Sequence, residues 1–167
     1  MARKAFYSFH YKPDNWRAAQ VRNMGVVEGN SPISDNDWEE VKKKGEKEIQ
    51  DWIDGQLRGR SCTVVLIGEK TAKRKWINYE IEKSWNSGKG LLGIYIHKLK
   101  NSAGEQAEKG ANPFDSFTVG EDKKKLSDIV KAYDPPFQTS TYVYDHIKTN
   151  LEDWVEKAIT IRNEYGK

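Results

Sequence analysis

A short apolar run followed by an amphipathic segment constrains the fold of this chain more than any other stretch. Residues 63–68 read Thr-Val-Val-Leu-Ile-Gly, an unbroken run that predicts a strand buried on both faces of a parallel sheet. Ile77, Ile81 and Trp85 recur every fourth residue, which predicts a helix with one apolar face. In a strand–helix crossover the helix begins at the carboxyl edge of the sheet, where open α/β folds bind ligands. Glu80 is therefore expected near that edge, beside the buried face.

Strands and helices alternate along the rest of the chain. Further strands are predicted over residues 4–10, 25–27 and 91–96, and further helices over about 14–24, 37–59, 123–132 and 145–163. This alternation predicts one α/β domain over residues 1–167, with a flavodoxin-like, mostly parallel sheet covered by helices on both faces. Gly45 lies in the apolar stripe of the 37–59 helix, where it is expected to allow a close backbone approach. The polar, glycine-rich composition of residues 98–120 predicts a long irregular insertion, a kind of segment that is often functional or mobile.

Composition sets limits on partners and location. The chain has 28 basic and 25 acidic residues, a net charge of +3 that is too balanced to indicate nucleic acid or a membrane surface as partner. Cys62 is the one cysteine, so it is expected to be a buried free thiol in a reducing cytoplasm. No stretch has the length and hydrophobicity of a membrane span or a signal sequence. The three histidines are scattered, and no metal site is expected.

The expected crevice contains one carboxylate, Glu80. In the flavodoxin-like order the first strand lies beside residues 63–68, so Ser8 and His10 are expected to share this crevice with Glu80. No Gly-rich phosphate loop or Gly-x-Ser-x-Gly elbow is present. Ordinary glycosidases need two acids, because the leaving oxygen must be protonated. The nicotinamide of NAD is a cationic pyridinium that leaves as a neutral base, so one carboxylate that stabilises the ribose cation is sufficient. Glu80 is therefore the candidate catalytic residue, with NAD as substrate.

Aromatic and basic side chains near Glu80 fit such a substrate. Phe6 and Trp76 are candidates to sandwich adenine or nicotinamide. Lys73, Arg74 and Lys75 lie at a helix start, where the macrodipole disfavours cations unless they face an anion such as a diphosphate. Each of these residues also has an ordinary structural interpretation: an aromatic is most often part of the core, and a charged residue at a helix start is most often solvated.

Several of these residues together resemble the TIR domain. They are the segment Phe6-Tyr7-Ser8-Phe9-His10, Asp14 soon after it, the strand over residues 63–68, and Trp76-x-x-x-Glu80. Three segments give a narrower similarity, to the bacterial TIR-like family that includes ThsB, the sensor of the Thoeris anti-phage system. They are Phe9-His10-Tyr11, Trp76-x-x-Tyr79-Glu80-Ile81 and Asn112-Pro113-Phe114-Asp115. The similarity covers most of residues 3–115 and, more loosely, the C-terminal helix.

The resemblance implies a function. It implies that NAD is cleaved with release of nicotinamide and that the ADP-ribose is cyclised into a signal that activates a ThsA-like effector during phage infection. A phage-derived trigger or self-association is implied as well. Carried over by residue, Glu80 is the catalytic glutamate, Trp76 lines the site, and Phe6, Ser8 and His10 face it. Two other interpretations stay open: a non-catalytic TIR-like adaptor, and a hydrolase similar to nucleoside deoxyribosyltransferases.

Overall fold

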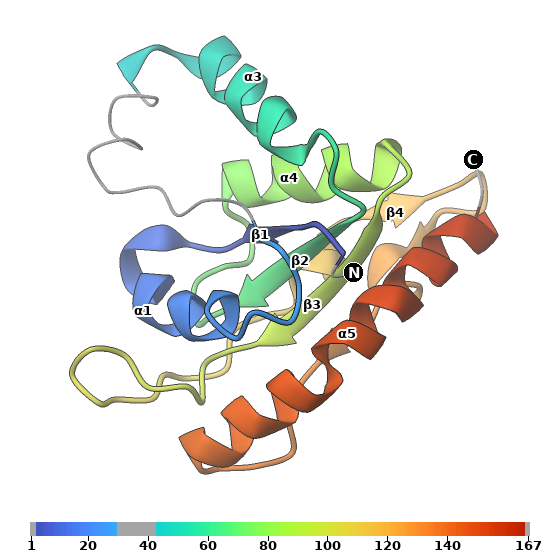
Figure 1. Ribbon diagram of the computed structural model, residues 1–167. Helices are drawn as coiled ribbons and strands as arrows, with labels where there is room; N and C mark the ends of the chain where they lie inside the picture. The colour runs from blue at the N-terminus through green and yellow to red at the C-terminus, as the bar shows by residue number, and fades with distance from the viewer. Residues whose placement is uncertain (1–2, 30–42, 166–167) are drawn as a thin grey trace.

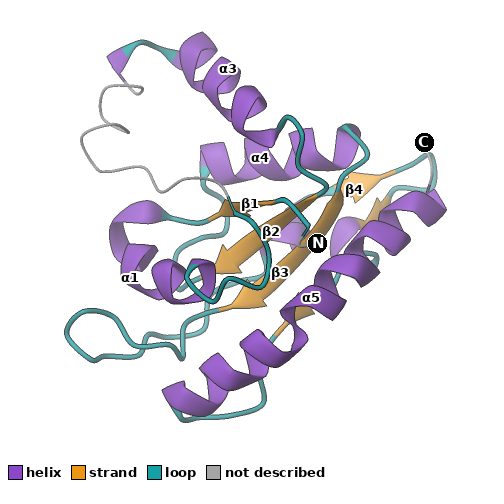
Figure 2. Ribbon diagram, in the orientation of Figure 1, coloured by secondary structure: helices purple, strands orange, loops and turns teal. Residues whose placement is uncertain are grey.

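A parallel sheet forms the centre of the molecule. The computed structural model describes residues 3–29 and 43–165. Four parallel strands lie in the order β1-β2-β3-β6: β1 (Ala5–Ser8), β2 (Cys62–Ile67), β3 (Gly90–Tyr95) and β6 (Ala132–Tyr133). The arrowheads of β2 and β3 point to the same edge of the sheet in Figure 2. This architecture confirms the predicted α/β, flavodoxin-like fold.

Helices cover both faces of the sheet (Figure 1). One face is covered by α1 (Tyr11–Arg22) and α5 (Ser140–Tyr165), the other by α3 (Glu46–Leu57) and α4 (Lys75–Asn86). Strand side chains alternate between the two faces. In β2, for example, Val64 and Leu66 pack toward α1 and α5, whereas Val65 and Ile67 pack in the cluster that includes α4. The predicted helices around Glu80 and near the C-terminus are thus confirmed.

A close backbone approach seats α5 on the sheet at Gly90. A Cβ atom at Gly90 would lie 2.8 Å from the backbone nitrogen of Ile159, nearer than real Cβ atoms come. The absence of a side chain in β3 therefore allows the α5 backbone to pack directly against the strand.

Two predictions near the N-terminus need correction. The first helix starts at Tyr11 instead of about residue 14, because Pro13 falls in the first turn, where a backbone N–H has no helical partner in any case. The predicted strand over residues 25–27 is reduced to one parallel bridge between Glu28 and Lys4. This bridge still lies beside β1, which is the place of the second strand in a flavodoxin-like order.

Two predicted helices were also wrong. The continuous helix over residues 37–59 is interrupted at Gly45, whose φ of 105° is incompatible with helix, and α3 begins only at Glu46. Residues 37–42 lie outside the described part. The predicted helix over residues 123–132 is instead the end of a hairpin, with strands β4 (Thr118–Val119) and β5 (Lys124–Lys125), followed by the short helix η2 (Leu126–Asp128). Lys123 has a φ of 51° in the turn of this hairpin. A residue with such left-handed backbone angles cannot continue a right-handed helix.

The insertion over residues 98–120 is attached to the body of the protein. Arg17, 4% exposed, donates hydrogen bonds to the carbonyl oxygens of Leu99 (2.8 Å) and Glu105 (2.9 Å). The Asp14 carboxylate lies 3.5 Å from the same guanidinium. Because Arg17 belongs to α1, one buried side chain ties both ends of the exposed turn between Leu99 and Glu105 to a helix.

A second attachment comes from the Asn-Pro-Phe-Asp motif that the sequence singled out. The short helix η1 (Pro113–Ser116) begins there, and the Asn112 side chain accepts a hydrogen bond of 2.9 Å from the backbone N–H of Phe114. Phe114 is fully buried. Its ring lies over Gly93 of β3, where a Cβ atom would come within 3.1 Å. The motif is therefore an anchor for the insertion.

We predict that Phe114→Ala lowers the free energy of unfolding by about 3–5 kcal/mol, the usual cost of removing a buried ring. Phe117→Ala is the matched control, since Phe117 is only partly buried against the same cluster, and its loss should be clearly smaller. Urea unfolding followed by circular dichroism measures both. Equal losses for the two variants would contradict the anchoring role of Phe114.

Candidate functional site

The Glu80 carboxyl group is buried at the junction of β1, β2 and α4. The sequence places Glu80 on the flank of the apolar stripe of α4, so packing of that stripe on the sheet carries the acid inward. Its side chain is 8% exposed. Ser8, the last residue of β1, is 1% exposed and donates a hydrogen bond of 2.5 Å to Glu80 Oε1. The structure thus brings together two of the predicted site residues.

Burial controls the protonation of this acid. Desolvation raises the pKa of Glu80 from 4.5 to about 8, and the hydrogen bond from Ser8 opposes this rise. A carboxylate is strongly favoured over the neutral acid when a cation comes near, because burial weakens screening by water. The site is therefore set to become negative when a positively charged group binds.

The backbone around Glu80 is held by two more hydroxyl groups. Ser84 Oγ donates to the Glu80 carbonyl oxygen at 2.6 Å, and it lies 2.6 Å from Thr63 Oγ1 on β2. Both side chains are fully buried. Ser84 follows Trp76 and Glu80 at intervals of four residues, so the sequence places it on the same side of the helix. The contact made by Thr63 could not be predicted, because Thr63 belongs to an apolar run.

The two predicted aromatic residues occupy different environments. Phe6 is 2% exposed and belongs to a core cluster with residues of α3. Trp76 is partly buried and packs against this cluster, edge-on to Tyr79 with ring centroids 5.8 Å apart. Trp76 therefore keeps part of its ring exposed, while Phe6 lies in the core.

Basic residues gather in the loop between β2 and α4. His10 precedes α1 and is partly buried, and burial together with the nearby charges of Arg74 and Lys70 lowers its pKa. The His10 Nδ1 atom is buried without a hydrogen-bond partner among the described residues. The basic cluster at residues 73–75 did not point to Lys70, although Lys70 belongs to the same loop and lies near His10. Lys73 is exposed, with a φ of 68° just ahead of the helix.

Lys75 has a carboxylate partner among the described residues. Its ammonium group forms an ion pair with Glu46 at the start of α3. The same ammonium lies 5.1 Å from the centroid of the Trp76 ring. Within residues 3–29 and 43–165, Lys75 is therefore the one of the three predicted phosphate contacts whose charge is offset by a carboxylate.

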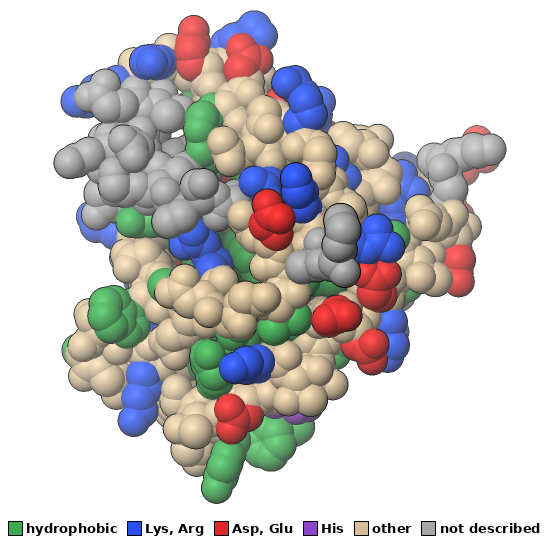
Figure 3. Space-filling model, in the orientation of Figure 1, with side chains coloured by type: hydrophobic (Ala, Val, Ile, Leu, Met, Phe, Trp, Pro, Cys, Tyr) green, Lys and Arg blue, Asp and Glu red, His purple; other side chains and the backbone are tan. Residues whose placement is uncertain are grey.

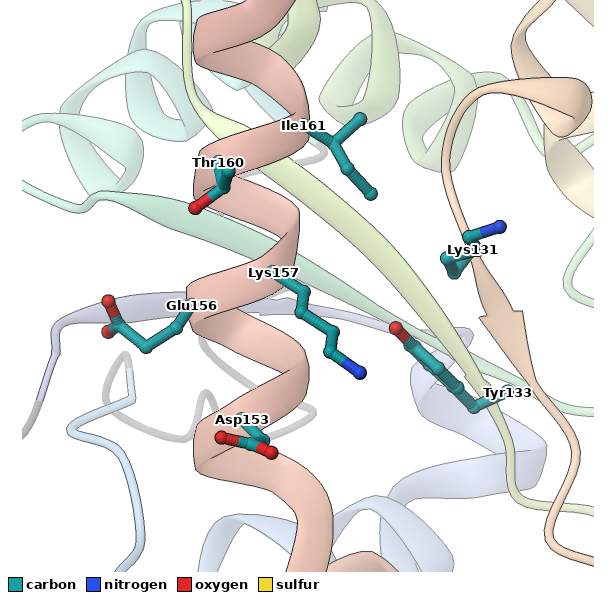
Figure 4. A pocket seen from close by; sticks show the side chains of 7 residues that line it. All are labelled: Lys131, Tyr133, Asp153, Glu156, Lys157, Thr160 and Ile161. Carbon is teal, nitrogen blue, oxygen red and sulfur yellow. The ribbon is translucent and has the colours of Figure 1, made fainter.

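A hollow lies away from Glu80, between the β6 strand and α5 (Figure 4). Lys131 and Tyr133 face the α5 side chains across it, and its volume is about 470 Å³. The lining includes two basic and two acidic residues, Lys131, Lys157, Asp153 and Glu156. Because these charges cancel, the hollow is a poor match for a diphosphate. Basic and acidic side chains are likewise interspersed over the face seen in Figure 3.

Two further observations concern ligands and membranes. Within residues 3–29 and 43–165, no three His, Cys, Asp or Glu side chains are grouped so that they could hold a metal ion. In the same part of the chain, no helix is both long and apolar enough to cross a bilayer.

Comparison with known proteins identifies the family. A family model described as "Thoeris protein ThsB, TIR-like domain" matches residues 6–101, more than half of the chain. The chain belongs to the ThsB family of TIR-like domains. A Bacillus cereus (strain MSX-D12) protein named "Putative cyclic ADP-D-ribose synthase ThsB1" is 37% identical over 133 residues, which cover 75% of this chain and 69% of that protein. Every predicted site residue of this ThsB family member, from Phe6 to Glu80, lies within the matched range.

We predict that Glu80→Gln stabilises the folded protein, and more so at high pH. The folded-state pKa of Glu80 lies above its ordinary value of 4.5, at about 8. The folded state therefore holds a proton that the unfolded state has lost, and stability falls by up to about 1.4 kcal/mol per pH unit across this interval. Gln still accepts the hydrogen bond from Ser8 but carries no charge.

Thermal unfolding of both proteins at pH 5, 7 and 9 provides the measurement. The gain in Tm for Glu80→Gln should grow from pH 5 to pH 9. Glu82→Gln, which changes an exposed acid on the same helix, should show no such growth. A constant difference at all three pH values would mean that Glu80 has an ordinary pKa.

Proposed function

We propose that this protein cleaves NAD at the bond between ribose and nicotinamide and closes the remaining ADP-ribose into a cyclic signalling molecule. The observation that carries the proposal is the buried carboxyl group of Glu80, which accepts a hydrogen bond from Ser8 at the carboxyl edge of the parallel sheet. The name of the Bacillus cereus relative, which says that it makes cyclic ADP-D-ribose, supports the same reaction.

The proposed reaction breaks one bond and forms another without redox change. The C1′–N bond of the nicotinamide ribose breaks, and its electron pair goes to the ring nitrogen, so nicotinamide leaves as a neutral molecule. Positive charge then develops at C1′ and the ribose ring oxygen. The Glu80 carboxylate stabilises this charge. A nucleophilic atom elsewhere in the same ADP-ribose attacks C1′, closes the ring and releases a proton if it carried one.

The substrate itself favours the reactive form of Glu80. In the free protein burial favours the neutral acid, with a pKa of about 8. The pyridinium of NAD is a cation, and its approach lowers the pKa of a nearby carboxyl group. Binding of NAD thus promotes ionisation of Glu80, and departure of neutral nicotinamide leaves the carboxylate facing the ribose cation.

The remaining predicted residues take roles that match their environments. We assign the exposed part of Trp76 to stacking on a base, with Phe6 supporting it from the core cluster. Arg74 and Lys73 are assigned to the diphosphate, together with His10 beside Arg74. Lys75 contributes less, because Glu46 offsets its charge. Ser8 acts on Glu80 through its hydrogen bond.

The proposal extends to the signalling role of the family. The cyclic product is a diffusible signal for a ThsA-like effector, and cleavage begins when infection supplies a phage-derived trigger or promotes self-association. We place the activity in the cytoplasm, since the lone cysteine, Cys62, is a buried free thiol. The reaction requires neither a metal ion nor nucleic acid.

The direct test follows nicotinamide release and product masses from NAD, with purified protein and with lysate of infected cells. Glu80→Gln should lower the rate by about 10²–10³, the effect of removing one preorganised electrostatic group. Glu82→Gln, the exposed acid of the same helix, should cleave as the unmodified protein does. Equal cleavage by Glu80→Gln would overturn the assignment of Glu80.

Two controls separate the rival functions. Deoxynucleosides offered in place of NAD should remain intact, and their cleavage would favour a deoxyribosyltransferase-like hydrolase. NAD that stays intact in every lysate, while the protein retains a bound partner, would favour the adaptor.

A second prediction compares two neighbouring cations. Arg74→Ala should raise the KM for NAD about tenfold, as expected when one charge-assisted hydrogen bond to a phosphate is lost. Lys75→Ala should change KM less than about threefold, because Glu46 already offsets the charge of Lys75. Initial rates over a range of NAD concentrations give both values. The reverse order would mean that Lys75 contacts the substrate and Arg74 does not.

A further inference from the structure

Three buried hydroxyl groups surround Glu80 in a layer that is otherwise apolar. Ser8, Thr63 and Ser84 are at most 1% exposed. The helix–sheet packing around them is built from side chains such as Ile81 of α4 and Val65 of β2. Hydroxyl groups in such a layer require hydrogen-bond partners, and apolar residues of the same shape fill it equally well. Their presence therefore calls for a role beyond packing.

The hydrogen bonds around Ser84 have a defined direction. A serine hydroxyl has one proton, and Ser84 donates it to the Glu80 carbonyl oxygen at 2.6 Å. In the 2.6 Å contact between Thr63 Oγ1 and Ser84 Oγ, Thr63 must then be the donor. A chain of hydrogen bonds thus runs from β2 through α4 to the backbone of Glu80.

We propose that Thr63 and Ser84 are positioning residues that hold the turn of α4 carrying Glu80, so that its carboxylate stays in hydrogen-bonding contact with Ser8. Glu80 is then fixed at two points. Ser8 of β1 holds the carboxylate at 2.5 Å, and Thr63 of β2 holds the backbone carbonyl through Ser84. The importance of this arrangement for catalysis rests on the proposed function, whereas the arrangement itself does not.

Titration of the Glu80 side-chain carboxyl carbon by NMR tests the proposal without any need for NAD. The signal is assigned by its absence from Glu80→Gln. The Ser8 hydrogen bond favours the ionised form of Glu80, so a carboxylate that drifts away from Ser8 must titrate at higher pH. Ser8→Ala, which removes that bond directly, is the positive control.

Thr63→Val and Ser84→Ala should each move the titration midpoint upward by about half a pH unit or more, the size expected for loss of one hydrogen bond. Thr63→Ser, which keeps a hydroxyl, should restore the original midpoint. Val64→Ala destabilises the opposite face of the same strand and should leave the midpoint unchanged. Ser84→Ala removes only one oxygen atom, so it carries the test if Thr63→Val does not fold.

An unchanged midpoint in Thr63→Val and Ser84→Ala would overturn the proposal, as would an equal shift in Val64→Ala. In NAD cleavage, both hydroxyl deletions should lower kcat about tenfold to a hundredfold, as expected for a displaced catalytic group. Failure of the proposed function has a different signature. In that case Glu80→Gln cleaves NAD like the unmodified protein while the shifts in titration persist.

Discussion

The rest of the site depends on keeping one carboxyl group inside an apolar helix–sheet layer. Burial of Glu80 opposes its charge, and the short hydrogen bond from Ser8 favours that charge. Such a balance suits a reaction in which the substrate arrives as a cation and one product leaves neutral. The protein does not need a second acid, because protonation of the leaving group is not required. The same burial makes the folded state less stable than a neutral residue would, a common feature of catalytic sites.

The parallel sheet brings together residues of the site that lie far apart in the sequence. β1 and β2 are adjacent and parallel, with Ser8 paired to Val65, so both strands end at one edge. The loops that follow them bring His10 and the basic residues before α4 to that edge. The one-residue bridge at Glu28 keeps the flavodoxin-like order, even though the described residues form no full second strand there.

Local patterns in the sequence were sufficient to predict the main helices and strands and the position of Glu80 on its helix. The apolar run of β2 and the four-residue spacing in α4 fix both the strand–helix unit and the flank on which Glu80 lies. Contacts between distant residues were not predictable in this way. The pairing of Lys75 with Glu46 and the burial of Phe6 beneath Trp76 depend on where α3 packs. The break at Gly45 was missed because an apolar stripe records spacing and not backbone dihedral angles.

The buried guanidinium of Arg17 also has a practical consequence for engineering. It donates hydrogen bonds to the carbonyl oxygens of Leu99 and Glu105, and Phe114 anchors the chain further on. The stretch from Ser102 to Gly104 lies between these two carbonyl groups in the chain and is exposed to solvent. Extra chain spliced into this tip would leave through solvent without pulling on the sheet edge. The tip is thus a natural place to graft an epitope or a fluorescent reporter, so that the protein could be followed in living cells with the surroundings of Glu80 undisturbed.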